Sequence, residues 1–338
     1  MLAALSVPSA YAQYASGTFS LPPRYPLKAK WSRVGLKNCE DAQGANVIFP
    51  SQVTNNLWIL GNNYFHFYLI KGNDTCALVE IGISAMVDIL LEQLSSIGAK
   101  PDFLIVTHPH SDHVTGLDSL KQAFPKAKVI VGKGAESFLN HPKAAKTIIN
   151  EDRYMAESMA FHGLLTQRHV IAAVPSLSGC KVMNDGDELD LGGLMISFWE
   201  AKGHSPGNIL VHIPDLKTIL VSDSLGNHYP GQGFFPTFFT GYTDYLATID
   251  RLLALNPQIL GLAHNGLFSR DEDIKDIFQK SREAANYVKA YVINNDVRDD
   301  ETIARNLFKF YYNDELTIYS PENILNCCRL LVRRIKEL

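Results

Sequence analysis

Three histidines and one aspartate lie within six residues of this sequence: His108, His110, Asp112 and His113. Imidazoles and carboxylates grouped in this way lose hydration unless something compensates them, and a bound metal ion does so. Because side chains alternate along an extended segment, His108 and His110 point the same way and can bind one ion. Asp112 and His113 follow at a turn, from which they can bind a second ion nearby.

The elements that must position this cluster follow from the hydrophobic pattern. A short apolar run at 103–106 predicts a buried strand that ends directly before the cluster. Short apolar runs separated by turn residues predict further strands at 57–60, 65–70, 76–81 and 128–131, and helical spacing predicts helices at 85–97 and 116–124. These predictions place the cluster on a loop after a buried strand.

The second half of the chain repeats this order. The pattern predicts a helical stretch at 141–168, strands at 195–200, 209–213, 218–221 and 258–262, and a helix at 244–255. Two successive halves, each with strands followed by helices, predict an α/β fold in which two sheets pack face to face with helices outside. After residue 269 only helical spacing remains, which predicts a C-terminal helical extension.

The string of residues from His108 to His113 resembles the metallo-β-lactamase superfamily, and matches to that family's remaining ligand segments occur in the same order. Gly203-His204-Ser205 resembles the segment with the third histidine of the first site. Ser222-Asp223 resembles the segment with the bridging aspartate, and Ala263-His264-Asn265-Gly266 the one with the last histidine. The resemblance covers about residues 55–268 and implies a four-layer αββα sandwich.

The resemblance also implies the ligand set. The first metal is expected at His108, His110 and His204, and the second at Asp112, His113 and His264, with Asp223 bridging the two. Imidazole and carboxylate ligands suit zinc, iron or manganese, and zinc is the first expectation for the two divalent ions. His110 argues against flavodiiron-type oxidases, which usually have a carboxylate there. Asp223 argues against the antibiotic-hydrolysing subclass that places cysteine at this position.

The activity implied by this resemblance is hydrolysis. A hydroxide bridging the two ions would attack the substrate, and Asp112 would orient this nucleophile while remaining a ligand. The order of a sandwich followed by helices resembles glyoxalase II and, more closely, the quinolone signal response group of 2-aminobenzoylacetyl-CoA thioesterases. We therefore expect an ester or thioester of a small, partly apolar molecule as substrate. Mononuclear iron persulfide dioxygenases, and signalling proteins with a vestigial metal site, are the alternatives that stay open.

Aromatic residues after Asp223 and in the C-terminal extension are candidates for a substrate pocket. A glycine-containing aromatic segment beside a metal site can form the wall of an apolar pocket, or it can pack in the core. The candidate substrate contacts are Phe234, Phe238, Phe239 and Tyr311. The C-terminal helices must cover either an edge of the sandwich or another subunit, so a homodimer is one arrangement that they allow.

Composition narrows the partners. The 31 lysines and arginines against 35 acidic residues give a net charge of −4, which disfavours a nucleic-acid backbone as partner and leaves a small molecule. No apolar stretch approaches the roughly 18 to 20 residues that span a bilayer, so no membrane partner is expected. The cytoplasm is the expected compartment, while Ala10-Tyr11-Ala12 resembles a signal-peptidase site and leaves an exported form open.

These patterns divide the chain into three parts: an irregular N-terminal arm at 1–53, the catalytic domain at 54–268 and the helical extension at 269–338. The five cysteines are odd in number and include no C-x-x-C pair. The sequence therefore predicts neither a disulfide framework nor a structural zinc knuckle.

Overall fold

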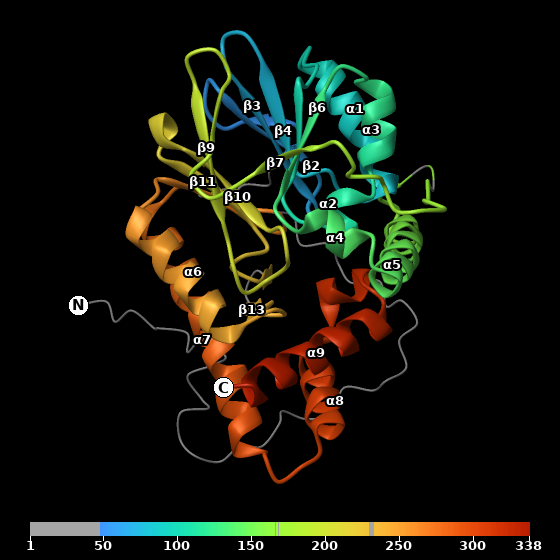
Figure 1. The fold of residues 1–338 in the computed structure, drawn as a ribbon, viewed down its shortest axis with the longest axis vertical. Coiled ribbons are helices and arrows are strands. Elements are labelled where there is room, and N and C mark those ends of the chain that lie inside the picture. Colours follow the sequence, from blue (N-terminus) through green and yellow to red (C-terminus); the bar gives the residue numbers. More distant parts are fainter. Residues whose placement is uncertain (1–47, 166, 168, 230–232) are drawn as a thin grey trace, which may run out of the picture.

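The computed structural model describes residues 48–165, 167, 169–229 and 233–338. The segment Ala10-Tyr11-Ala12 and most of the predicted arm therefore lie outside the described residues. Two sheets stand side by side in the upper part of the molecule, and three long helices extend below them (Figure 1). The predicted α/β sandwich with C-terminal helices is confirmed.

Each sheet carries one half of the sandwich. The first sheet has seven strands in chain order: β1 (Ser51–Gln52), β2 (Leu57–Gly61), β3 (His66–Lys71), β4 (Cys76–Val79), β5 (Phe103–Val106), β6 (Lys128–Gly132) and β7 (Lys181–Met183). The second sheet has six, in the order β15 (Leu267–Phe268), β14 (Ile259–Leu262), β11 (Thr218–Ser222), β10 (Ile209–Ile213), β9 (Met195–Glu200) and β8 (Glu188–Asp190). A separate hairpin consists of β12 (Asn227–Tyr229) and β13 (Gly233–Phe235).

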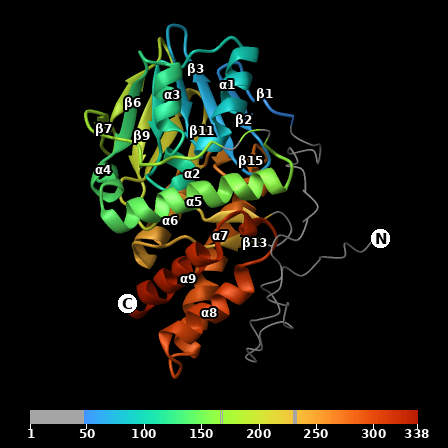
Figure 2. The same cartoon turned by 90° about the vertical axis from the view of Figure 1, so that its right-hand side faces the viewer.

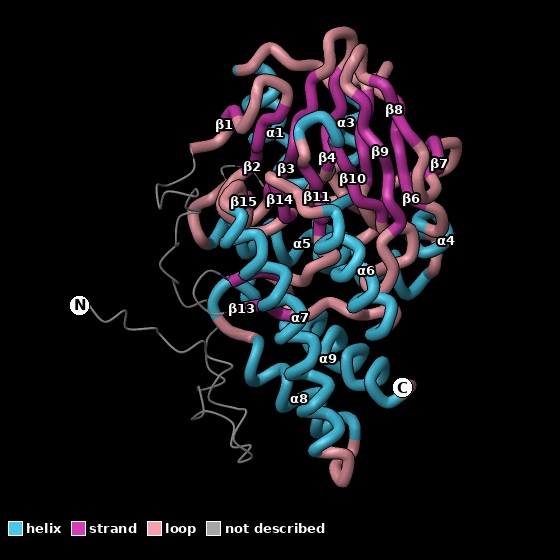
Figure 3. The backbone as a smooth tube through the Cα atoms, turned by 90° about the vertical axis from the view of Figure 1, so that its left-hand side faces the viewer, coloured by secondary structure: helices cyan, strands magenta, loops and turns pink. Residues whose placement is uncertain are grey.

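Helices lie on the outer sides of this sandwich and below it, as Figures 2 and 3 show from two opposite sides. Within the sandwich part of the chain they are η2 (Ser84–Met86), α1 (Val87–Ser96), α2 (Ser111–Val114), α3 (Leu117–Ala123), α4 (Ala135–Leu139), α5 (Pro142–Phe161), η3 (Pro214–Leu216) and α6 (Tyr242–Leu255). The C-terminal appendage, residues 269–338, contains α7 (Asp271–Asn294), α8 (Asp300–Tyr311), η4 (Asp314–Ile318) and α9 (Pro321–Lys336).

Alternation along the strands separates two layers of the core. In β4, Ala77 and Val79 pack with side chains of the second sheet such as Phe198, whereas Leu78 belongs to the cluster that includes the helices. A strand covered on both faces is apolar throughout, which is why these runs show no alternation with polar residues. The apolar face of α9, including Leu331, continues the helical cluster, so the appendage shares a core with the sandwich.

The structure corrects the sequence prediction at several boundaries. Ser51 pairs antiparallel with Ile59, so β1 lies within the range predicted as an irregular arm. The predicted helical stretch at 141–168 ends at Phe161, before Gly163 takes a φ of +74°. Among the described residues, no helix has both the length and the apolar character needed to cross a membrane.

Candidate metal centre

The predicted metal ligands all follow strands. His108 is the second residue after β5, and His110 is the N-cap of α2. Helix α2 begins at Ser111, so Asp112 and His113 lie in its first turn. The other three residues follow β9, β11 and β14 of the second sheet. Because β5 is parallel to its neighbours β4 and β6, and β11 is parallel to β14, these loops meet at one end of the sandwich.

A glycine fixes the direction of the loop that carries His204. Gly203 has a φ of +101°, which side chains other than glycine rarely tolerate. A Cβ at this position would lie 2.4 Å from the backbone nitrogen of Tyr245, at the start of α6. The loop after β9 can therefore approach α6 closely at Gly203, directly before His204, only because this residue has no side chain.

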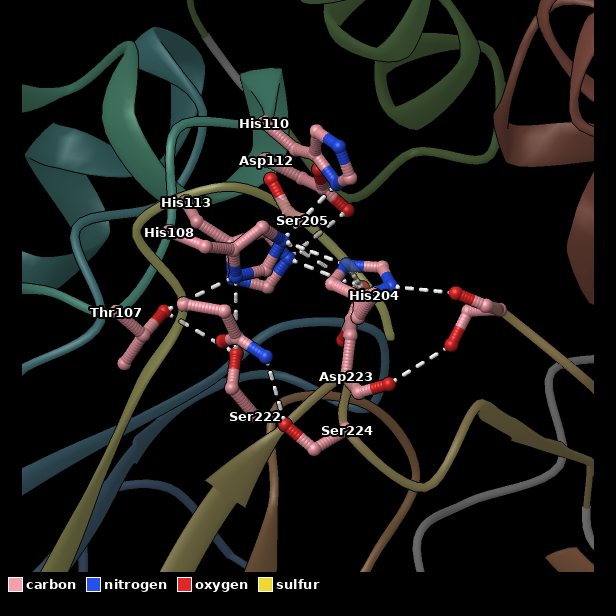
Figure 4. Close-up of polar contacts among 12 residues, drawn as sticks. Thr107, His108, His110, Asp112, His113, His204, Ser205, Ser222, Asp223 and Ser224 are labelled. Atoms are coloured by element: carbon pink, nitrogen blue, oxygen red, sulfur yellow. Dashed lines mark hydrogen bonds and ion pairs between the residues drawn. The ribbon is translucent and has the colours of Figure 1, made fainter. Parts of the chain in front are cut away.

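Three histidines form the first group of donors. Nε2 of His108 lies 3.0 Å from Nδ1 of His110 and 3.1 Å from Nε2 of His204. Figure 4 shows these three rings turned toward one another. The structure thus brings together the three side chains that the sequence assigned to the first metal.

Two aspartates and two histidines form the second group. Oδ2 of Asp112 lies 3.4 Å from Nε2 of both His113 and His264. The two oxygens of Asp223 lie 3.4 Å from the same two nitrogens. Oδ2 of Asp223 is also 3.8 Å from Nε2 of His204 and 3.9 Å from Nε2 of His108, so this carboxylate lies between the two groups.

The far ring nitrogens of three histidines are held by hydrogen bonds. Nδ1 of His204 donates to the carbonyl of Thr237 at 3.0 Å, and Nδ1 of His264 donates to the carbonyl of Tyr64 at 2.7 Å. Nδ1 of His113 pairs at 2.7 Å with the carboxylate of Glu80. Such bonds place the proton on Nδ1 and leave the Nε2 lone pair free to bind a metal.

Glu80 was not identified from the sequence. It follows β4 with a φ of +73° and is 3% exposed, and its Oε2 also accepts a hydrogen bond from Thr107 at 2.9 Å. The sequence does contain a signal for Glu80, because this acidic residue directly follows a buried strand, as Asp223 directly follows β11.

Three metal-binding atoms of this centre are buried and have no hydrogen-bond partner, only oppositely charged neighbours at 3.4 Å: Nε2 of His113, Nε2 of His264 and Oδ1 of Asp223. Each unsatisfied buried polar group costs about 1–3 kcal/mol, and more if it is charged. A cation bound between them would satisfy all three atoms. The residues present therefore fit a divalent metal ion by their donor chemistry and by what they lack.

The electrostatics of the two groups differ. Burial lowers the pKa of His108 well below its usual value and lowers that of His110 to about 3, so both imidazoles are neutral and able to bind metal. Burial also opposes a charge on His264, but Asp223 and Asp112 outweigh it and raise the pKa of His264 to about 10. For His113, the charges of Asp112, Glu80 and Asp223 outweigh burial and raise its pKa well above the usual value. The carboxylates of the second group thus favour a positive charge at Nε2 of these two histidines, where a proton and a metal ion compete for the same lone pair.

The four predicted substrate contacts lie in different surroundings. The ring of Phe239 is 5.4 Å from that of His204 and 6.3 Å from that of His110. In contrast, Phe238 is fully buried and packs against Tyr242 of α6. The other two rings pack elsewhere in the protein interior, Phe234 on His228 and Tyr311 on Phe235. Of the four, only Phe239 has a ring contact with the metal-site histidines.

A small pocket opens beside His264. Its lining combines aromatic, aliphatic and amide side chains from the sandwich and the appendage: Tyr64, Phe65, Asn227, Tyr229, Asn265, Ile318 and Tyr319. The hydroxyl of Tyr319 donates a hydrogen bond of 2.8 Å to Oδ2 of Asp112. Burial and the nearby carboxylates raise the pKa of Tyr319 well above its usual value, so its phenol remains a donor. Nothing near residue 319 in the sequence signals this contact.

Two face-to-face sheets whose loops gather histidines and aspartates into adjoining groups define a metal-binding αββα protein. The sequence model of the metallo-beta-lactamase superfamily matches residues 66–264, which is more than half of the chain. The chain therefore belongs to this superfamily, as its ligand segments predicted. The resemblance to the quinolone signal response group stays a prediction.

Several relatives and solved structures share this family or fold. A metallo-beta-lactamase fold-containing protein of Sulfurisphaera tokodaii is 26% identical over 63% of this chain and 78% of its own length. The acyl-coenzyme A thioesterase MBLAC2 of Gallus gallus is 23% identical over 57% of this chain and 68% of its own. A hydroxyacylglutathione hydrolase of Ruegeria pomeroyi is 28% identical over 58% of this chain and 59% of its own.

Among solved structures, an archaeal metallo-beta-lactamase superfamily protein from Sulfolobus tokodaii has a TM-score of 0.53 at 20% identity, covering 82% of this chain and 94% of that one. The sec-alkylsulfatase Pisa1 from Pseudomonas sp. has a TM-score of 0.61 at 14% identity, covering 84% of this chain and 49% of that one. These similarities show the fold.

Proposed function

We propose that the protein is a dinuclear metal-dependent hydrolase that cleaves an ester or thioester of a small, partly apolar molecule. The observation that carries this proposal is the pair of adjoining donor groups, of which every member except the half-buried His110 is buried, with three metal-binding atoms that have no hydrogen-bond partner. A protein that acts only through surface contacts has no need for such atoms. Zinc is the ion we expect first, because imidazole and carboxylate ligands suit it.

Two divalent ions in these groups would lower the pKa of a bound water toward neutrality and polarise the carbonyl oxygen of a substrate. The protein itself would contribute ionised carboxylates and the orientation of the water nucleophile. Neighbouring histidines keep the pKa of Asp112 and Asp223 well below the usual value against the effect of burial, so both remain ionised. Asp112 is therefore available to accept a hydrogen bond from a water nucleophile and to orient it.

The surroundings of the centre favour a small, partly apolar substrate. Phe239 lies beside the first group, and the pocket beside His264 has apolar walls at Phe65 and Ile318 as well as the amide of Asn227. The names of two relatives, acyl-coenzyme A thioesterase and hydroxyacylglutathione hydrolase, point to acyl substrates. The net charge of −4 disfavours a nucleic acid.

Metal removal and reloading test this proposal. The protein is stripped with a chelator, reloaded with zinc, iron or manganese, and assayed on acyl-coenzyme A thioesters, acylglutathiones and aryl esters. We expect hydrolysis that is lost on stripping and restored by at least one ion. His204→Ala should abolish it, while His212→Ala should not, since His212 lies on β10 against Trp199. A fully loaded protein that hydrolyses none of these compounds would contradict the proposal.

A mononuclear iron dioxygenase needs only one group of donors. The structure brings together two groups, of three and four residues, and this favours two ions over one. One iron per chain together with oxygen consumption on a persulfide would decide for the dioxygenase.

A further inference from the structure

Tyr319 brings the C-terminal appendage into the metal centre. It lies at the turn between η4 and α9, 207 positions from Asp112 in the sequence, and its hydroxyl donates to Oδ2 of that carboxylate at 2.8 Å. The same oxygen lies 3.4 Å from Nε2 of His113 and of His264. Tyr319 thus contacts the oxygen of Asp112 that faces the second group of ligands.

The backbone on both sides of this phenol is held in place. The hydroxyl of Tyr312 donates to the carbonyl of Tyr319 at 3.1 Å. The amide of Ser320 donates to Oε2 of Glu151 at 3.1 Å, and its hydroxyl donates to the other oxygen of this carboxylate. Ser320 is also the N-cap of α9, where its Oγ accepts from the amide of Asn323. The backbone at Tyr319 is therefore held from two sides, by Glu151 of α5 through Ser320 and by Tyr312 at the end of α8.

The same helix holds the loop that carries Asp112. Asp152, the residue after Glu151 on α5, accepts hydrogen bonds from the hydroxyl of Thr115 at 2.5 Å and the amide of Ser84 at 2.9 Å. Thr115 follows α2, which carries Asp112. Successive residues of an α-helix point about 100° apart, so the two carboxylates reach different neighbours. Figure 2 shows α5 running between the sandwich and the appendage, as this double contact requires.

A carboxylate oxygen has two lone pairs, and a donor that occupies one of them fixes the direction of the other. Partners of this kind, outside the ligand shell, commonly change metal affinity by about 10- to 100-fold when they are removed. We propose that Tyr319 is a positioning residue that orients Asp112 toward a metal ion in the second group, and that Glu151 acts through Tyr319. The C-terminal appendage then completes the metal centre. This inference rests on the proposed dinuclear centre, but on no particular substrate.

Removal of one hydroxyl tests the proposal. Tyr319→Phe deletes the donor and keeps the ring, and Tyr242→Phe is the matched control, because its hydroxyl binds Asn286 at 2.6 Å and no metal ligand. Stripped proteins are titrated with zinc against a chromophoric chelator, and with cobalt while the visible spectrum is recorded. We expect Tyr319→Phe to bind one ion as the wild type does and the second about 10- to 100-fold more weakly, with an altered cobalt spectrum. Wild-type affinity for both ions in this variant would overturn the proposal.

The role of Glu151 is tested by a double-mutant cycle. Glu151→Gln should weaken binding of the second ion, and adding it to Tyr319→Phe should cause no further loss, because both changes act on the same contact. Additive losses would show that Glu151 does not act through Tyr319. Thermal unfolding confirms that each variant folds, and Ser320→Ala replaces Glu151→Gln if the latter does not.

The failure of this inference and that of the proposed function can be told apart. If the wild type hydrolyses thioesters while Tyr319→Phe keeps both ions at full affinity, the inference fails and the function stands. If the wild type binds two ions but hydrolyses nothing, and Tyr319→Phe weakens binding of the second ion, the function fails while the positioning role stands. A wild type that binds fewer than two ions contradicts both.

Discussion

Glu80 provides a graded test of how the centre holds its second metal. Its Oε2 accepts two hydrogen bonds, from Nδ1 of His113 at 2.7 Å and from the hydroxyl of Thr107 at 2.9 Å. It is 3% exposed, so water cannot replace it as an acceptor. Hydrogen bonds to an ionised acceptor are about twice as strong as neutral ones. Glu80 therefore orients His113 and makes it a better electron donor to a metal.

Two substitutions separate charge from orientation. Glu80→Gln keeps a neutral acceptor for His113 and should weaken the second metal by about 1 kcal/mol, which is roughly fivefold. Glu80→Ala removes the acceptor and should weaken it by about 10- to 100-fold, or about 1.4 to 2.8 kcal/mol. The control is Asp102→Asn, because Asp102 accepts a hydrogen bond from the amide of Cys76 and contacts no metal ligand.

The assay is competitive zinc titration of each stripped variant, followed by thermal unfolding with and without zinc. We expect the order wild type, Glu80→Gln, Glu80→Ala in decreasing affinity, and a smaller rise of Tm on zinc addition in the same order, because a ligand that binds the folded state stabilises it. If Glu80→Ala binds both ions as tightly as the wild type, then Glu80 does not support His113 and this reasoning is refuted.

Three further predictions concern aromatic side chains: His66 and Phe238, which are buried, and Phe239, which is half-buried. Burial lowers the pKa of His66 to about 3, below its unfolded value near 6.5, so its contribution to stability is present above pH 6.5 and is lost as the pH falls toward 3. This loss of stability amounts to at most about 5 kcal/mol. In an acid titration followed by circular dichroism, His66→Phe should therefore unfold at lower pH than the wild type. An unchanged midpoint pH of unfolding would show that another group controls acid unfolding. Phe238→Ala should cost about 3–5 kcal/mol of stability in urea unfolding, since Phe238 is fully buried. Phe239→Ala should raise KM with a smaller loss of stability, and equal effects of the two substitutions on KM would contradict the assignment of Phe239 to the substrate site.

The local pattern of the sequence was sufficient for much of the fold and for the candidate ligands. The strands at 195–200 and 209–213 match β9 and β10 at both ends, because apolar runs bounded by turn residues are local signals. The cluster from His108 to His113 is likewise visible in the sequence because its four metal-binding residue types lie within six positions. Short strands such as β1, β7 and β15 have only two or three residues, too few to show any period.

The residues that the sequence did not reveal depend on contacts between distant segments. Tyr319 approaches Asp112 only because α5 fixes the appendage, and no spacing rule connects positions this far apart. Phe238 and Phe239 are adjacent in an irregular segment between β13 and α6, where no helical or strand period tells which ring turns inward. In the structure, Phe238 packs against Tyr242, and Phe239 lies beside His204.

Anomalous diffraction at the zinc edge, from crystals of the full chain grown with zinc, would show how many ions the protein binds and which residues hold them. We predict two peaks in each molecule, one bound by His108, His110 and His204 and the other by Asp112, His113 and His264, with Asp223 in contact with both. A single peak, or peaks bound by other residues, would contradict a dinuclear centre at this site.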